Sequence, residues 1–214
     1  MKAEDRILLI DKPRGWTSFD VVKKVRNVLG IRKVGHAGTL DPLATGLLIV
    51  CTGKMTKKTN ELMGLQKEYT ATLVVGQTTP SHDLETETSQ QKPIGHLTAG
   101  AIHNAASGFM GEILQTPPAY SAVRVGGKRA YTMARAGKPV QLEPRTVEVS
   151  ALEVEAMRLP EIDFRIVCSK GFYVRSFARD YGEALGTGAY LKALRRTAIG
   201  PYRVDHAITV DKVE

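Results

Sequence analysis

Residues 35–46 read Gly-His-Ala-Gly-Thr-Leu-Asp-Pro-Leu-Ala-Thr-Gly, and the apolar run 47–51, Leu-Leu-Ile-Val-Cys, follows directly. Three glycines and a proline within twelve residues predict a loop with close backbone approaches, and the apolar run is typical of a buried strand. The loop carries one imidazole, His36, and one carboxylate, Asp41. Reactive side chains often sit on a loop that a rigid strand supports. The alternative is a plain Asx turn, in which Asp41 bonds local amides before Pro42.

Segments of both secondary-structure types surround this loop. Apolar periodicity, capping patterns and turn residues predict strands at 7–10, 47–51, 69–75 and 164–168, and helices over roughly 18–29, 98–110, 129–136 and 174–185. The two types interleave without the even rhythm of a doubly wound fold. No repeat or Ser/Pro-rich linker divides the chain. We therefore predict an α+β (mixed α/β) fold in a single domain, 1–214.

Composition excludes several classes of protein. A chain of 214 residues with 43% hydrophobic and 24% charged residues is neither mainly disordered nor too short for a sizeable core. Cys51 and Cys168 are its only cysteines, which excludes a disulfide scaffold and favours two buried thiols. No apolar run reaches the roughly 18 residues of a membrane helix, and the N-terminus lacks a signal-peptide pattern. We expect a cytoplasmic protein with no membrane partner.

The charge distribution favours a polyanionic partner. The formal net charge is +8, and the basic excess concentrates in residues 120–145 and 165–203. Arg195 and Arg196, which we expect near a C-terminal basic helix, are candidate phosphate contacts. Binding should then weaken steeply as salt rises, because phosphate neutralisation releases counterions. A solvated basic face with no nucleic-acid role is the alternative.

Common cofactor and metal motifs are not found in the sequence. Gly53-Lys54 lacks the spacing of a phosphate loop, and there is neither a Gly-x-Ser-x-Gly elbow nor a His-Glu-x-x-His pair. The five histidines are scattered, and neither cysteine has a partner at metal-ligand spacing. We expect no metal and no cofactor.

The whole string 35–46 closely resembles the defining motif of the TruB family of tRNA pseudouridine synthases. Further blocks match that family in the right order: Asp-Lys-Pro-Arg-Gly-Trp-Thr-Ser at 11–18, Lys-Glu-Tyr at 67–69, Gln-Thr-Pro-Pro-Ala-Tyr-Ser-Ala at 115–122, Cys-Ser-Lys-Gly-Phe-Tyr-Val-Arg-Ser at 168–176 and Leu-Arg-Arg-Thr at 194–197. The resemblance therefore covers almost the full length of the chain.

The resemblance implies roles for three residues. Asp41 is the catalytic carboxylate of an isomerisation in which uracil is detached, turned and rejoined through C5. Whether Asp41 attacks covalently or acts as a base stays open. Arg175 is expected to pair with Asp41 and keep it charged, and Tyr69 is expected to stack on the target base.

The resemblance also implies roles for four further residues. His36 resembles the family histidine that occupies space in the loop as the uridine is flipped out; the alternative is a simple turn histidine. Tyr173 and Lys12 resemble pocket-lining residues, and the alternatives are core packing for Tyr173 and a surface salt bridge for Lys12. Asp83 aligns less firmly with a pocket aspartate of the family, because residues 80–85 depart from its usual Asp/Thr/Ser-rich stretch.

The implied fold is that of pseudouridine synthases, a central, mostly antiparallel sheet flanked by helices and loops. The implied function is isomerisation of the uridine at position 55 in the T-loop of tRNA, with the T-arm as partner and no obligate protein partner. The chain ends at Glu214, soon after the last motif, so we expect no RNA-binding PUA domain and an affinity that rests on the catalytic domain.

Two other functions remain open from the sequence. An RNA-binding or RNA-folding protein with dispensable activity would share the basic segments, but it has no need of a carboxylate in a glycine-rich loop. A synthase guided by small RNA would be expected to carry a PUA domain and to bind protein partners.

Overall fold

The computed structural model describes residues 5–89 and 91–214. The chain forms two compact units. The first contains the residues up to Thr70 together with Ala193–Glu214, and the second is Ala71–Lys192. Strands β4 (Lys67–Val75) and β10 (Ala189–Ile199) contribute residues to both. No helix within the described part of the chain is long and apolar enough to cross a bilayer.

In the first unit, strands β12, β1, β3 and β10 lie side by side in that order. The β1–β3 and β2–β3 pairs are antiparallel, and β3 pairs with β10 in parallel. The other helices and strands of the first unit are β1 Ile7–Lys12, α1 Ser18–Leu29, β2 Val34–His36, β3 Thr45–Thr52, α2 Thr59–Gly64, β11 Tyr202–Arg203 and β12 Ile208–Thr209. Short 3-10 helices lie at Gly53–Lys58, Val204–His206 and Val210–Lys212.

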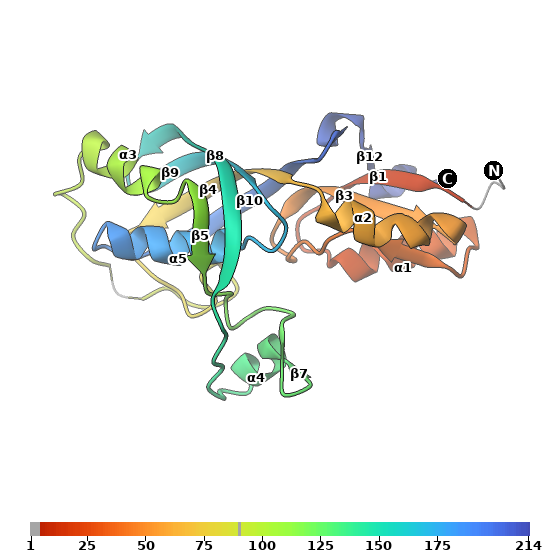
Figure 1. The fold of residues 1–214 in the computed structure, drawn as a ribbon, viewed down its shortest axis with the longest axis horizontal. Helices are drawn as coiled ribbons and strands as arrows, with labels where there is room; N and C mark the ends of the chain where they lie inside the picture. The colour runs from red at the N-terminus through yellow and green to blue at the C-terminus, as the bar shows by residue number, and fades with distance from the viewer. Residues whose placement is uncertain (1–4, 90) are drawn as a thin grey trace. The chain divides into compact units, whose positions relative to one another are not determined.

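The apolar run of β3 is buried on both faces. Leu48 and Val50 belong to a core cluster with Val21 and Val25 of α1. Alternate residues of the strand, Leu47, Ile49 and Cys51, belong to a second cluster with Leu62 of α2 and Ile199 of β10. Because α1 and α2 cover β3 from both sides (Figure 1), the strand does not alternate between apolar and polar residues. Such a strand is a rigid support for the loop that precedes it.

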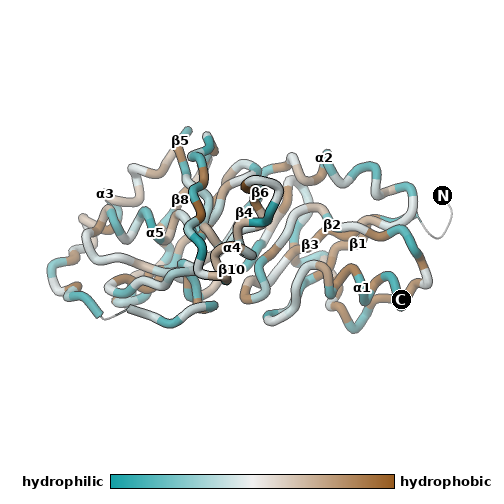
Figure 2. Tube along the Cα trace, turned by 90° about the horizontal axis from the view of Figure 1, so that it is seen from below, coloured by the Kyte–Doolittle hydropathy of each residue, from teal (hydrophilic) through white to brown (hydrophobic). Residues whose placement is uncertain are grey.

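Helix α1 begins and ends as its sequence predicts. The Thr17 hydroxyl accepts the Asp20 N–H at 3.0 Å, and the Asp20 carboxylate accepts the Thr17 N–H at 2.9 Å, which is a complete capping box. Gly30 ends the helix in the left-handed region at φ 64°. Hydrophobic and hydrophilic residues alternate along the helix (Figure 2), and Val21, Val22 and Val25 form its buried side.

In the second unit, strands β4, β9, β8 and β5 lie side by side in that order. The β8–β9 and β5–β8 pairs are antiparallel. The other bounds are α3 Ala99–Ser107, β5 Gly111–Gln115, β6 Arg124–Val125, β7 Lys128–Arg129, α4 Ala130–Arg135, β8 Arg145–Arg158, β9 Glu161–Cys168 and α5 Val174–Ala184. Within this unit, the segment with β7 and α4 extends past the ends of β5 and β8 (Figure 1).

Aromatic rings fill the core of the second unit. Phe177 and Tyr181 of α5 lie 5.3 and 5.1 Å, ring centre to ring centre, from Phe164 of β9. Phe109 contacts Phe177 edge-on at 5.2 Å. The Tyr181 hydroxyl donates to the Ile102 carbonyl of α3 at 2.9 Å, which satisfies its one buried polar atom. This packing places α5, and therefore Arg175 in its first turn.

The α+β prediction is confirmed, as are the strands around Ile7, Leu47, Tyr69 and Phe164 and the helices from Ser18, Ala99, Ala130 and Val174. Both cysteine side chains are buried, as predicted. Strands β8 and β10 were not predicted. The expected basic helix near Arg195 and Arg196 is wrong, because both residues lie in β10, where they pair with Thr45 and Gly46 of β3.

Candidate active site

Asp41 lies in the loop 37–44, between β2 and β3 of the first unit. The residue before it, Leu40, donates its N–H to the Ser18 hydroxyl oxygen at 2.9 Å and accepts the Ser18 hydroxyl at 3.2 Å. After it, the Ala44 N–H donates to the Asp41 carbonyl at 3.1 Å. Ser18 is itself buried in the first turn of α1. Helix α1 therefore holds the backbone before the carboxylate, and a hydrogen-bonded turn within the loop fixes the backbone after it.

Lys12 holds the same loop from the end of β1. Its side chain is 0% exposed. The ammonium donates to the carbonyls of Trp16 at 2.7 Å, Pro13 at 3.0 Å and Pro42 at 3.3 Å. The prediction of Lys12 as a pocket-lining residue is not tested by these contacts, but the alternative of a surface salt bridge is wrong because the side chain is buried.

Arg196 holds the loop from β10, the strand that pairs with β3. The guanidinium is 1% exposed and donates to the carbonyls of Leu47 at 2.8 Å, Gly38 at 3.1 Å and Thr39 at 3.5 Å. The expectation that Arg196 binds phosphate is therefore wrong: its donors are used inside the protein. Its neighbour Arg195 forms a two-pronged ion pair with Asp11, at 2.7 and 3.0 Å.

Two glycines allow this close fit around Arg196. Gly46 has φ +100°, and a Cβ on it would lie 2.3 Å from the Arg196 carbonyl oxygen. Gly38 has φ +98°, and its Cβ would lie 3.7 Å from the Arg196 Nη1 atom. Only glycine adopts such positive φ values without strain. Gly46 thus lets β3 lie directly against β10, and Gly38 lets the loop adopt its left-handed backbone conformation.

Buried positive charge surrounds the loop. Burial lowers the pKa of Lys12 to about 8, while the charge of Asp41 acts in the opposite direction and that of Arg196 adds to the lowering. Burial and the Arg196 charge also lower the pKa of His36, so its imidazole is neutral at pH 7. His36 ends β2, one residue before the loop.

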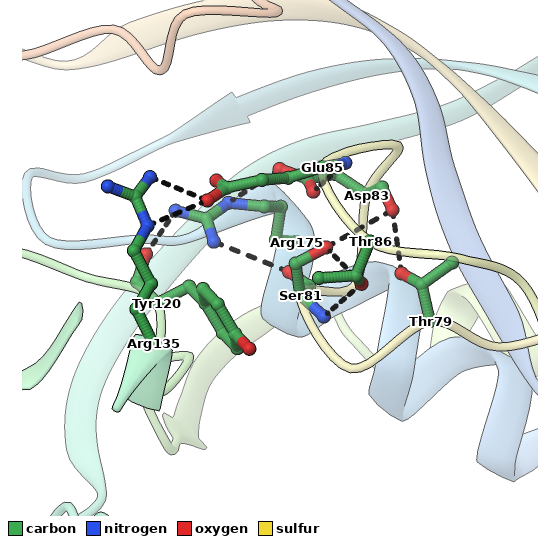
Figure 3. Close-up of polar contacts among 8 residues, drawn as sticks. All are labelled: Thr79, Ser81, Asp83, Glu85, Thr86, Tyr120, Arg135 and Arg175. Carbon is green, nitrogen blue, oxygen red and sulfur yellow. Dashed lines mark hydrogen bonds and ion pairs between the residues drawn. The ribbon is translucent and has the colours of Figure 1, made fainter. Parts of the chain in front are cut away.

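A second polar cluster lies in the second unit, around Arg175 (Figure 3). Arg175 and Asp83 are 4% and 5% exposed, and the Arg175 Nε lies 3.6 Å from the Asp83 Oδ2. The guanidinium also donates to the carbonyls of Tyr120 at 3.0 Å and Ser81 at 3.4 Å. A buried ion pair with these added hydrogen bonds fixes the Arg175 side chain.

The loop that carries Asp83 is itself held in place. The Asp83 Oδ1 accepts the Glu85 N–H at 2.9 Å, as in an Asx turn, and the Thr79 hydroxyl donates to the Asp83 carbonyl at 2.7 Å. Glu85 also forms an ion pair with Arg135 of α4 (Figure 3). His82, next to Asp83, has its pKa lowered to about 4 by burial and by Arg179 and Arg175.

The structure supplies partners that the sequence left undetermined. Arg175 pairs with Asp83, whose role the sequence assigned least firmly. The expected pair of Arg175 with Asp41 joins residues of different units and stays a prediction. Tyr173 exchanges two hydrogen bonds with the Gln115 side chain, at 2.7 and 3.2 Å, directly before α5.

Tyr69 is 9% exposed and lies on the face of β4 that also carries Ala71 and Leu73, both buried. Its role in stacking stays a prediction. Ser18 and Gln115 were not singled out from the sequence, although both lie inside the family-like blocks 11–18 and 115–122.

Two family models match consecutive parts of the chain. The model for the TruB family pseudouridylate synthase N-terminal domain matches residues 26–174. The model for the tRNA pseudouridylate synthase B C-terminal domain matches residues 175–214.

Curated relatives are similar over almost the whole chain. The tRNA pseudouridine synthase B of Flavobacterium johnsoniae is 50% identical over 99% of this chain and 95% of its own length. The enzyme of the same name from Opitutus terrae is 46% identical over 100% of this chain and 88% of its own length.

Solved structures are similar in fold. A crystal structure of a Cbf5-Nop10-Gar1 complex matches with a TM-score of 0.74 and 31% identity, over 96% of this chain and 53% of that one. A chain of an H/ACA RNP bound to a substrate RNA containing 2'-deoxyuridine matches with a TM-score of 0.71 and 29% identity, over 96% and 51%. This chain therefore spans about half the length of each of these two.

Proposed function

Because the chain belongs to the TruB family of pseudouridylate synthases, we propose that Asp41 performs the isomerisation of a uridine at position 55, in the T-loop of tRNA. The chain is a tRNA pseudouridine synthase, an isomerase. The partner is the T-arm of tRNA. A tRNA-modifying enzyme works where tRNA is found, so we place its action in the cytoplasm, with no cofactor and no obligate protein partner.

The observation that carries the role of Asp41 is the support of its loop. Ser18, Lys12 and Arg196 come from three different elements, and all three are buried. Each hydrogen bonds backbone groups of the loop 37–44 or of its immediate neighbours. Three buried polar side chains used to hold one short loop are far more than a surface turn requires. They give the carboxylate a fixed position, which catalysis needs more than stability does.

The chemistry requires the bond between uracil and ribose to break and a new bond to form at C5 of the base. A carboxylate can act as the nucleophile or as the base in this process. The target must first leave the base stack, since the enzyme cannot reach C5 and the ribose together inside a helix. Tyr69 would stack on the extruded base, and His36 and Tyr173 would line its pocket.

We assign to the Arg175–Asp83 pair of the second unit a separate charged role in the reaction, which rests on the family resemblance. The Asp83 carboxylate and the carbonyls of Ser81 and Tyr120 fix the guanidinium from three sides. An arginine held in this way is a positioned cation that can orient a carboxylate or a phosphate. All of residues 1–214 would then serve one catalytic function, as a single catalytic domain.

The test is the variant Asp41→Asn, which keeps the size of the side chain and removes its charge. We expect tRNA binding to be retained and conversion of an unmodified tRNA transcript to be lost, with pseudouridine measured by mass spectrometry. The matched control is Asp205→Asn, an exposed carboxylate in the same unit, which changes net charge equally and should convert normally. A transcript with cytidine at position 55 should not react. Turnover near wild type in Asp41→Asn would refute the assignment.

A further inference from the structure

Two large aromatic side chains are exposed beside the Asp41 loop. Trp16 is 36% exposed and Phe19 is 61% exposed. Trp16 lies in the turn after β1, and Phe19 lies in the first turn of α1. Of the two residues between them, Ser18 is instead buried and holds Leu40. We call Trp16 and Phe19 the aromatic pair.

The turn that carries the aromatic pair is joined to the Asp41 loop by direct hydrogen bonds. The Gly15 N–H donates to the Pro42 carbonyl at 2.7 Å. The Lys12 ammonium bridges the carbonyls of Trp16 and Pro42, at 2.7 and 3.3 Å. The backbone that carries Trp16 is therefore fixed against the Asp41 loop. Phe19 directly follows Ser18, whose hydroxyl is hydrogen-bonded to Leu40 of the same loop.

The surface around the rings suits bases better than phosphates. The polar groups at the start of α1 are used internally, because Thr17 and Asp20 satisfy each other in the capping box. Hydrogen bonds from Thr17 lower the pKa of Asp20, so a full negative charge stands at the helix start. That charge repels a phosphate at the one place where helix amides would attract it. Ring faces, in contrast, stack on any base regardless of sequence.

We propose that the aromatic pair is a stacking site for unpaired bases of the RNA that flank the target uridine. The inference rests on the proposed function, since it takes the occupant to be the RNA that reaches Asp41. The rings stand on backbone that is hydrogen-bonded to the Asp41 loop, so we expect RNA that reaches Asp41 to meet them. Single-stranded RNA is recognised largely by stacking on aromatic side chains. Arg14, exposed in the same turn, supplies a cation for the connecting backbone.

Trp16 makes a direct test possible, because it is the only tryptophan in the chain. Its fluorescence should be quenched when unmodified tRNA is added to the wild-type protein. Inorganic polyphosphate is the control, since it carries negative charge without bases and should leave the emission unchanged. Equal quenching by both, or no quenching by tRNA at saturation, would overturn the role of Trp16.

Phe19 is tested by substitution. We expect Phe19→Ala to weaken tRNA binding about tenfold, in line with one lost stacking contact, and to raise KM more than it lowers kcat. Phe19→Tyr should restore binding, because the ring remains. Val28→Ala shortens another exposed apolar side chain of the same helix, 42% exposed against 61% for Phe19, and should bind as wild type.

The outcomes separate this inference from the proposed function. Wild-type protein that binds and is quenched by tRNA, but converts no uridine, contradicts the function and leaves the stacking site standing. Normal tRNA affinity in Phe19→Ala refutes the stacking site while the isomerase activity stands. If Phe19→Ala instead dissociates a dimer in light scattering at unchanged tRNA affinity, the rings cover a second copy of the chain and the inference is wrong.

Discussion

Replacing Gly46 by alanine should displace the Asp41 loop, because Gly46 faces the backbone of Arg196. The added Cβ would lie 2.3 Å from the Arg196 carbonyl oxygen and 2.8 Å from its nitrogen. Ordinary contact distances are about 3.5 Å, so the strands must separate by roughly 1 Å. The contact is with backbone, and no side-chain rotation can relieve it. The φ of +100° adds strain of about 1–3 kcal/mol.

Two other glycines of the same unit separate the contribution of the steric clash from that of the backbone strain. Gly38 has a positive φ, but its Cβ would meet only the Arg196 side chain, at 3.7 Å. Gly35 has neither a positive φ nor any atom within 4 Å of the added Cβ. The loss of stability in Gly38→Ala therefore measures backbone strain alone. The loss in Gly35→Ala measures a glycine-to-alanine change that has neither backbone strain nor a steric clash. We expect unfolding free energies to fall by about 4 kcal/mol for Gly46→Ala, about 1–2 for Gly38→Ala and under 1 for Gly35→Ala.

Thermal unfolding and tRNA turnover are the two readouts. At about 2–4 °C per kcal/mol for a chain of this size, Gly46→Ala should lower Tm by roughly 10 °C and Gly35→Ala by no more than about 3 °C. Turnover of Gly46→Ala, measured well below its Tm, should fall by on the order of 100-fold, the usual cost of a 1 Å misplacement. A Gly46→Ala protein whose Tm lies within 2 °C of Gly35→Ala would show that β3 and β10 are not held against each other in this way.

The pKa of Lys12 predicts a pH dependence of stability. It is about 8 in the folded protein and 10.5 in an unfolded chain, so the cost of burying the charge is present in full below pH 8 and is relieved as pH rises toward 10.5. The unfolding free energy, measured with denaturant at pH 7.5 and at pH 9.5, should rise by roughly 1–2 kcal/mol more for the wild type than for Lys12→Met. A difference between the two proteins that stays constant with pH would contradict the lowered pKa of Lys12. The variant Tyr69→Phe should keep most of the tRNA binding, because the ring remains. The variant Tyr69→Leu should lose both binding and turnover, since stacking contributes on the order of 1–3 kcal/mol per base. Normal turnover in Tyr69→Leu, with only a lowered Tm, would assign the residue to packing.

The elements that the sequence predicted correctly are those whose determinants are local. Helix α1 is specified by a capping box between Thr17 and Asp20 and by apolar residues spaced along one face of the helix. Strand β3 is specified by five consecutive apolar residues. The string 35–46 and its companion blocks were sufficient to identify the family, because motif residues and their order are properties of the chain itself.

Strand β10 was missed because its partner is distant in sequence. Arg195 and Arg196 pair with Thr45 and Gly46, about 150 residues earlier. Basic residues in β10 carry no periodic signal for a strand, since Arg196 is buried by its hydrogen bonds to carbonyls rather than by apolar character. The pairing of this segment with β3, β4 and β11 makes it a strand.

The sequence alone therefore determined the family, the reaction and the position of Asp41 in a glycine-rich loop. The tertiary structure decided which charges hold that loop: Arg196, expected to bind phosphate, and Lys12, expected to line the pocket, are buried donors to its backbone. It likewise decided that Arg175 pairs with Asp83, 92 positions away. The sequence shows that a side chain is charged, but it does not show whether that side chain is hydrated, ion-paired or hydrogen-bonded inside the protein. Its partner is set by which segments the fold brings within about 3 Å, and that is a non-local property of the chain.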